Sequence, residues 1–144
     1  MNNDRSVLRF EKYLVKSISF EINENYEKED KKLKLDFDFD AKTDVKDNNL
    51  VVELGVNIFE NAKEKKYPFE MMIVLKGFFS IEGKENSVNI SVFEKNAIAI
   101  LFPYLRAIVS TYTANANVPP VLLPAMNINE YIRRKTEYKI SKQT

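Results

Sequence analysis

Cysteine and histidine are both absent from the 144-residue sequence, and glycine occurs only three times. Without cysteine the chain can form no disulfide, no thiolate nucleophile and no cysteine-containing zinc site. Without histidine it lacks the side chain most often used in general acid–base catalysis, and a Ser-His-Asp triad is excluded. The scattered glycines form no phosphate-binding loop. These absences favour a protein that binds rather than an enzyme, with no metal and no cofactor.

Neither sign of charge is in excess, and no apolar run is long. The 22 Lys and Arg residues nearly balance the 21 Asp and Glu residues, so the total charge selects neither a polyanion nor a cationic partner. The basic cluster at 133–135 is short, which is more typical of a solvated helix face than of a nucleic-acid interface. The longest apolar run, 97–102, is far below the roughly 20 residues of a membrane span. The N-terminus has no secretory h-region. We expect a cytoplasmic protein that inserts into no membrane and binds no nucleic acid.

Length and composition predict one globular domain. Apolar residues make up 44% of the chain, and a folded chain of this length buries roughly 70% of the surface that its unfolded form exposes. No internal repeat or linker divides the sequence. We expect a single domain over residues 1–144, with a core over about 10–140 and frayed ends.

Alternation of apolar and polar residues predicts four β-strands, over residues 13–22, 32–40, 50–59 and 68–81. In the first strand, one face is expected to carry Leu14, Ile18, Phe20 and Ile22. The polar stretch 23–32 is interpreted as a loop or crossover, and 47–49 as a turn. Short polar connections, and the lack of a helical period before residue 86, favour an antiparallel sheet.

From Ser87 onward the period changes to that of an amphipathic helix. Its apolar stripe consists of Ile98, Leu101, Phe102, Leu105, Ile108, Val109 and Tyr112. Pro103 is expected to start or kink the main helix, and Val118-Pro-Pro to end it. After an apolar linker over 121–128, Asn129 is expected to cap a second helix over 130–140, which ends in a basic tail.

The acidic stretch Asp36-Phe-Asp-Phe-Asp40 has the every-second-residue spacing of a calcium loop. However, Ala41 stands where that loop needs its sixth-position glycine, and Asp47 stands where it needs its twelfth-position glutamate. The strict apolar alternation is typical of a strand. We interpret the stretch as the solvated acidic face of a strand, without a metal.

The chain has more apolar surface than one small sheet and two helices need. The strand over 68–81 is apolar on both faces near its middle, Val51 and Phe59 fall on the polar face of their strand, and the segment 121–126 is apolar although irregular. Such surface is covered in a homo-oligomer, or it forms a groove for apolar segments of other chains. The two interpretations are compatible.

Several stretches resemble one family. The most specific is Ile100-Leu-Phe-Pro-Tyr-Leu-Arg106, which is similar to the start of that family's long helix. The others are Ser17-Ile-Ser-Phe-Glu21, Lys34-Leu-Asp-Phe-Asp38, Gly77-Phe-Phe-Ser-Ile81 and Val118-Pro-Pro-Val-Leu-Leu-Pro-Ala-Met-Asn127. Together, over about Tyr13 to Tyr131, the sequence resembles the SecB family of protein-export chaperones.

The resemblance implies an α+β fold: a four-stranded antiparallel sheet with two C-terminal helices packed on one face. It also implies a homotetramer, assembled as a dimer of dimers, that holds unfolded polypeptides or preproteins without ATP. A shallow apolar groove can bind many sequences by burial and can adapt its packing to each. The client groove would consist of Ile22, Phe37, Phe39, Leu122, Leu123, Met126, Ile128 and Tyr131.

The resemblance further implies a partner-docking face on the exposed side of the sheet. In proteobacterial members, carboxylates there dock the basic, zinc-containing tail of the SecA translocation motor. The corresponding face here would carry Ser17, Glu21, Glu53, Glu70 and Met72. The family's acids are only partly kept, and the C-terminal tail is basic. The partner is therefore either SecA or a different protein, such as the antitoxin of a toxin–antitoxin–chaperone system.

Two other classes of function stay open. One is a scaffold that keeps the fold and binds a single specific partner, which the near-neutral charge and the altered docking face favour. The other is a small-ligand enzyme on an α+β scaffold, which predicts a closed pocket with convergent polar groups.

Overall fold

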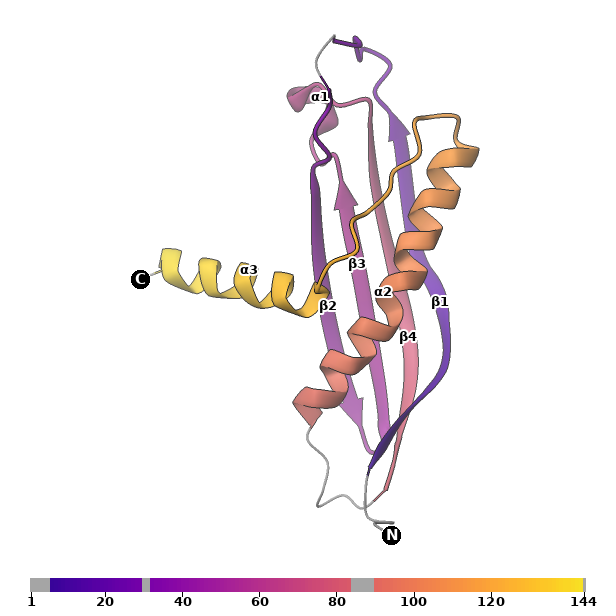
Figure 1. Ribbon diagram of the computed structural model, residues 1–144, viewed down its shortest axis with the longest axis vertical. Helices are drawn as coiled ribbons and strands as arrows, with labels where there is room; N and C mark the ends of the chain where they lie inside the picture. The colour runs from indigo at the N-terminus through magenta and orange to yellow at the C-terminus, as the bar shows by residue number, and fades with distance from the viewer. Residues whose placement is uncertain (1–5, 30–31, 84–89, 144) are drawn as a thin grey trace.

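The computed structural model describes residues 6–29, 32–83 and 90–143. Along this part of the chain the elements are β1 (Val7–Ile22), β2 (Phe37–Lys46), β3 (Asn49–Ile58), α1 (Ala62–Lys65), β4 (Phe69–Glu82), α2 (Ile90–Asn115) and α3 (Ile128–Gln143). The strands run along the long axis of the molecule (Figure 1). The predicted α+β class, with a sheet followed by helices, is confirmed.

The four strands form one antiparallel sheet in the order β1-β4-β3-β2. Residues that pair across neighbouring strands share a face, so the register Leu54↔Leu75 and Ala41↔Leu54 places the apolar positions of β2, β3 and β4 on one side. On that side the side chains of Leu54, Ile73 and Leu75 are fully buried. The antiparallel pairing predicted from the short connections is confirmed.

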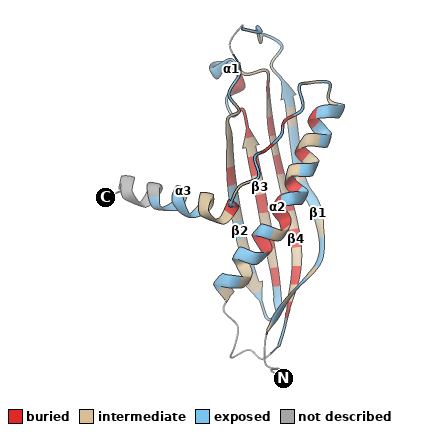
Figure 2. Ribbon diagram, in the orientation of Figure 1, coloured by how far each residue is buried: buried red, intermediate tan, exposed pale blue. Residues whose placement is uncertain are grey.

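Helix α2 crosses this apolar face, chiefly over β3 and β4 (Figure 1). Its residues Leu101 and Leu105 are fully buried, and Figure 2 shows buried residues on α2 and along the central strands. By length and composition alone α2 could cross a membrane. Its apolar face packs against the sheet.

Pro103 lies inside α2 and does not begin it, because the helix already starts at Ile90. Proline has no backbone N–H, so the carbonyl of Ala99 receives no hydrogen bond from position 103. Pro103 and Ala99 are both exposed, and water can therefore donate to this carbonyl instead. The change of period at Ser87 falls outside the described residues.

Strand β2 begins later than the alternation from residue 32 predicts. Residues 32–36 are not part of a strand, and pairing starts at Phe37, opposite Ile58. The reason is the lack of a partner strand: after Ile58 the backbone of Phe59 turns to a left-handed φ of 54°, and β3 ends. That turn also buries Phe59 against Tyr67 and Phe69, so Phe59 is not part of the surplus apolar surface.

Strand β1 is longer than predicted and contains two register shifts, between Phe10 and Lys12 and between Val15 and Ser17. Each shift inserts one residue and reverses the facing of the residues after it. Leu14 therefore pairs with Lys76 on the outer face, whereas Ile18 pairs with Ile73 on the core face. The prediction that Leu14 shares a face with Ile18 is wrong for this reason.

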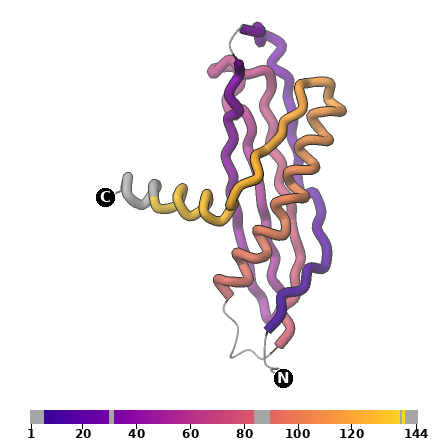
Figure 3. Tube along the Cα trace, viewed as in Figure 1, coloured from indigo at the N-terminus to yellow at the C-terminus, as the bar shows by residue number. Residues whose placement is uncertain are grey.

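Helix α3 does not pack on the sheet face, contrary to expectation. It starts beside the β2 edge and projects away from the body of the protein (Figures 1 and 3). Its cap is Asn127 rather than Asn129, because the Oδ1 atom of Asn127 accepts a hydrogen bond from the backbone N–H of Glu130 at 3.1 Å. The Asn129 amide instead donates to the Lys95 carbonyl at 2.9 Å.

Helix α2 approaches the sheet closely at Gly77. A Cβ atom there would lie 2.7 Å from both Cδ atoms of Leu101. We expect Gly77→Ala to lower the free energy of unfolding by about 1–3 kcal/mol, because overpacking moves buried side chains out of their rotamers.

Urea denaturation measures this change, and Gly55→Ala is the matched control. Gly55 is also in the sheet but on the outer face, where a Cβ would meet Val74 at 3.2 Å. An equal loss of stability in both variants would contradict close helix–sheet packing at Gly77.

Candidate functional site

The residues predicted to form one groove lie in three places. Five of them gather where the linker, the start of α3 and β2 meet: Phe37, Phe39, Met126, Ile128 and Tyr131. Leu122 and Leu123 lie further back along the linker, which passes beside α2. Ile22 ends β1, and β1 and β2 are opposite edges of the sheet. One chain therefore does not bring all of the predicted groove residues together.

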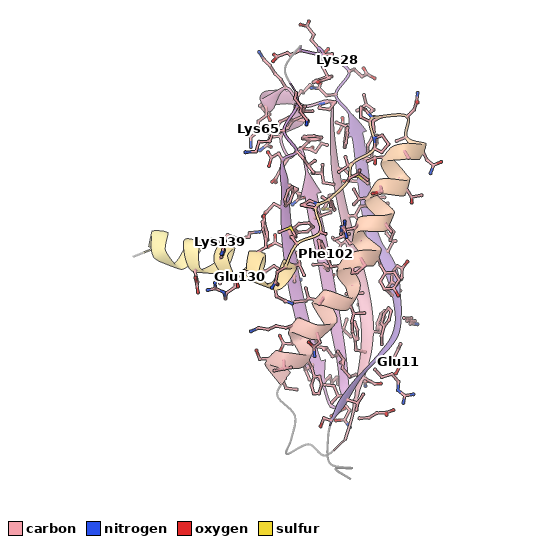
Figure 4. The ribbon with its side chains drawn as sticks, in the orientation of Figure 1. Glu11, Lys28, Lys65, Phe102, Glu130 and Lys139 are labelled. Carbon is pink, nitrogen blue, oxygen red and sulfur yellow. The ribbon has the colours of Figure 1, made fainter. Side chains whose placement is uncertain are left out.

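An aromatic cluster forms the first of these places. The ring of Phe39 lies 5.5 Å from that of Tyr131 and 5.4 Å from that of Phe102, both edge to face. Phe102, labelled in Figure 4, is a buried residue of α2. Phe39 and Ile128 are buried, whereas Phe37, Met126 and Tyr131 are half-buried. Phe39 and Ile128 are therefore not accessible to another molecule and only pack beneath the surface. Another molecule can contact Phe37, Met126 and Tyr131.

Charged groups fix α3 to β2 at this cluster. The Tyr131 hydroxyl donates to Asp38 at 2.9 Å, and the Lys135 ammonium donates to Asp38 at 2.8 Å and to Asp40 at 2.8 Å. Partial burial disfavours the charged form of Lys135, but the two carboxylates outweigh it and raise its pKa. Burial, and then the hydrogen bond to Asp38, raise the pKa of Tyr131. The acidic stretch that resembles a calcium loop thus binds a lysine.

The linker between α2 and α3 is irregular, and side chains of α2 bind three of its backbone polar atoms. Thr113 accepts from the Val121 N–H at 2.9 Å, Ser110 donates to the Val121 carbonyl at 3.0 Å, and Arg106 donates to the Leu123 carbonyl at 3.0 Å. These bonds fix the alternation of side chains, so that Val121 and Leu123 are buried and Leu122 is 76% exposed. A shallow hollow of about 260 Å³ lies between Leu122 and α2.

Ile22 lines a different and larger cavity, of about 600 Å³, at the end of the sheet that carries α1. Its lining is mainly polar and includes Asn23, Glu24, Asn61 and Glu70. Asn23 closes this end by donating to the carbonyls of Ala62 and Tyr67. The cavity therefore lacks the apolar character expected of a client groove.

A second apolar surface lies where α2 does not cover β1. On the core face of β1, Val15 and Ile18 are 43% and 40% exposed. On α2, the ring of Tyr104 packs against Tyr13 and that of Tyr112 against Phe20, both in a tilted arrangement, at the two ends of the same stretch of strand. We call Val15, Ile18, Tyr104 and Tyr112 the β1 edge surface. Alternation in the sequence could not identify the β1 edge surface, because this surface combines residues of β1 and α2 and depends on how these two elements pack together.

The predicted docking residues share the outer face of the sheet, opposite α2. The register pairs Glu21 with Glu70 and places Ser17, Met72 and Glu53 in neighbouring rows. Glu53 is bound by the ammonium of Lys16, and this hydrogen bond lowers its pKa. Glu70 accepts a hydrogen bond from the backbone of Asn61. The acids of this face are thus partly used within the chain.

Comparison with known proteins gives a consistent result. A family model described as preprotein translocase subunit SecB matches residues 1–138. An uncharacterized protein of Methanocaldococcus jannaschii is 35% identical over 126 residues, which cover 86% of this chain and 81% of the relative. The protein-export protein SecB of Orientia tsutsugamushi, strain Boryong, is 27% identical over 123 residues, covering 82% of this chain and 76% of the relative.

Two solved structures share the fold. A SecB-like chaperone of Mycobacterium tuberculosis, in complex with a ChAD peptide from the HigA1 antitoxin, has a TM-score of 0.64 at 14% identity. The match covers 83% of this chain and 90% of that one. A protein of unknown function from Streptococcus agalactiae has a TM-score of 0.52 at 18% identity, covering 84% of this chain and 99% of that one. At these identities the likeness concerns the fold.

The contacts of Lys135 predict that it holds α3 in place. We expect Lys135→Met to speed amide hydrogen exchange over residues 131–137 by about tenfold, because Asp38 and Asp40 lose a charged donor. Lys139→Met is the control, since Lys139 lies on the projecting part of α3 (Figure 4). Equal exchange in the two variants would contradict the anchoring role of Lys135.

Proposed function

Because the chain belongs to the SecB family, we propose that it is an ATP-independent holdase chaperone, which binds unfolded polypeptides through apolar surface. The observation that carries the proposal is that the linker holds an apolar side chain, Leu122, in a fixed and exposed position. Leu122 is 76% exposed although it belongs to an apolar run, and the linker is fixed to α2 by three side-chain bonds. An apolar side chain held outward on a rigid support is suited to contacts with another chain.

The client surface that we propose combines Leu122 with the half-buried residues at the start of α3. Phe37, Met126 and Tyr131 supply two aromatic rings and a flexible thioether, which can repack against different side chains. Phe39, Leu123 and Ile128 are buried beneath them and act as support. Ile22 is not part of this surface, unless another copy of the chain brings its own Ile22 to it.

We also propose that copies of the chain associate through the β1 edge surface, toward a dimer of dimers. Strand β1 is an edge of the sheet, and exposed apolar edges are normally paired or covered. Association would cover Val15 and Ile18 together with the tyrosines of α2. It would also account for the apolar residues that the core of one chain does not use.

The chain has two candidates for a specific partner. The outer sheet face supports docking of SecA only at the end where Glu21 and Glu70 lie together, because Glu53 is neutralised by Lys16. This observation favours the second candidate, a dedicated partner such as an antitoxin, and the M. tuberculosis chaperone with the same fold binds an antitoxin peptide. In either case we expect a cytoplasmic binding protein without catalytic activity.

Chaperone activity is measured as suppression of light scattering by an aggregating client. We expect the wild-type chain to suppress scattering and Leu122→Ser to require about tenfold more protein for the same effect, since one exposed leucine contact is lost. Val92→Ser is the control, because Val92 is also exposed but lies in the first turn of α2. No suppression by the wild-type chain in excess over the client would refute the proposal.

Self-association is measured as mass in solution by multi-angle light scattering. We expect a multiple of the 16.8 kDa chain mass, and a shift toward the single chain for Ile18→Glu, because a charge would be buried at the β1 edge surface. Leu122→Ser should leave the mass unchanged. A wild-type mass of one chain at micromolar concentration would overturn the oligomer.

A further inference from the structure

The outer face of the sheet is divided by charge along its length. Near α1 it carries Glu21, Glu70 and Asp38. Toward the hairpin between β2 and β3, four lysines come together from three strands: Lys12 in β1, Lys76 in β4, and Lys42 and Lys46 in β2. Among the described residues none of these four forms a salt bridge. The other acids at this end are Asp44, Glu11, Asp47 in the β2–β3 turn and Glu82 at the end of β4. Glu53 is bound by Lys16, and Glu82 is bound by Arg9.

An aromatic ring lies at the centre of these lysines. The ammonium of Lys12 lies 5.2 Å and that of Lys76 5.7 Å from the centre of the Phe78 ring. Phe78 is half-buried on the outer face, and it pairs across the sheet with Val51, which is half-buried too. We call Lys12, Lys42, Lys76, Val51 and Phe78 the basic aromatic patch. The two ammonium groups lie against the Phe78 ring and can still bind an anion. Such an anion would lie beside an apolar contact with the ring.

The positive field of the patch acts on its own carboxylate. The pKa of Glu53 is lowered first by its hydrogen bond to Lys16, and the charges of Lys16, Lys42 and Lys76 lower it further. Lys42, Glu53 and Lys76 lie in one row of the sheet register, which explains this convergence. A second carboxylate placed over the row would meet the same charges, since within the described part of the chain Lys42 and Lys76 form no salt bridge of their own.

The arrangement also selects the class of partner. Acids interleave with the lysines, as Asp44 and Glu11 do, so a polyanion with charge at every step would meet repulsion. The same argument disfavours a membrane rich in anionic lipid, which attracts clusters of uninterrupted positive charge. A polypeptide can place a carboxylate over each lysine and an apolar side chain over Phe78, so its charge and apolar pattern match the patch.

We propose that the basic aromatic patch docks an acidic polypeptide segment that carries an aromatic or aliphatic side chain between its carboxylates. The site is separate from the client surface, because it lies on the opposite face of the sheet from α2 and the linker. It favours an acidic partner, in contrast to the basic partner that the acids near Glu21 suit. The proposal goes beyond holdase activity and does not depend on it.

The test uses the full chain and a fluorescein-labelled peptide, Glu-Glu-Phe-Glu-Glu-Leu-Glu-Glu, in an anisotropy titration. We expect micromolar binding that weakens with added salt, and binding at least about tenfold weaker for the double variant Lys12→Glu/Lys76→Glu. Phe78→Ala should weaken binding as well. The matched control is Lys63→Glu/Lys95→Glu, which reverses two exposed lysines elsewhere and should bind as the wild type does.

The same titration can also give results that contradict the proposal. Equal binding of the version of the peptide with lysine in place of glutamate, or equal loss in both double variants, would overturn the proposal. Tighter binding of phosphatidylserine vesicles or single-stranded DNA than of the acidic peptide would overturn the choice of partner. Suppression of client aggregation should be unchanged in Lys12→Glu/Lys76→Glu, so failure of docking and failure of the chaperone proposal are distinguishable.

Discussion

One constraint determines most of this structure: a single long helix must cover the apolar face of a four-stranded sheet. Helix α2 approaches the sheet closely where Gly77 leaves room for Leu101, and this contact places the helix over β3 and β4. A helix is about 10 Å wide and neighbouring strands are about 4.8 Å apart, so one helix covers roughly two strands. The edges of the sheet need another cover, and that need shapes both the linker and the exposed surfaces.

The two edges meet this need in different ways. On the β2 side the linker and the first turn of α3 complete the core, with Val121, Leu123 and Ile128 buried. An irregular segment can cover the core there because Thr113, Ser110 and Arg106 of α2 form hydrogen bonds with backbone atoms of Val121 and Leu123. On the β1 side no segment of the described chain performs this task, and Val15 and Ile18 stay exposed. The client surface and the association surface that we propose are thus two consequences of the same incomplete coverage.

The sequence predicts the sheet well and its interruptions poorly. Alternation is a local property, and it identified β3 and β4 almost to their ends and the antiparallel pairing. It could not show that Leu33 and Leu35 lack a partner strand, or that shifts in β1 turn Leu14 outward, because both depend on what lies opposite. For a similar reason the sequence did not show that one chain leaves the predicted groove residues in separate places. These residues were joined by family likeness, whereas Ile22 and Phe37 belong to opposite edges of the sheet.

On the outer face, the charge that a predicted docking residue presents depends on its cross-strand neighbours. Glu53 is acidic in the sequence, yet Lys16 binds its carboxylate, and Lys42 and Lys76 flank it in the register. A basic partner approaching Glu53 would therefore first meet lysines, and would have to break an existing ion pair to reach the carboxylate. Glu21 and Glu70 lie outside this field, at the other end of the strands. The charge that a partner meets is set by these cross-strand neighbours, so one face can offer opposite signs at its two ends while the whole chain is almost neutral.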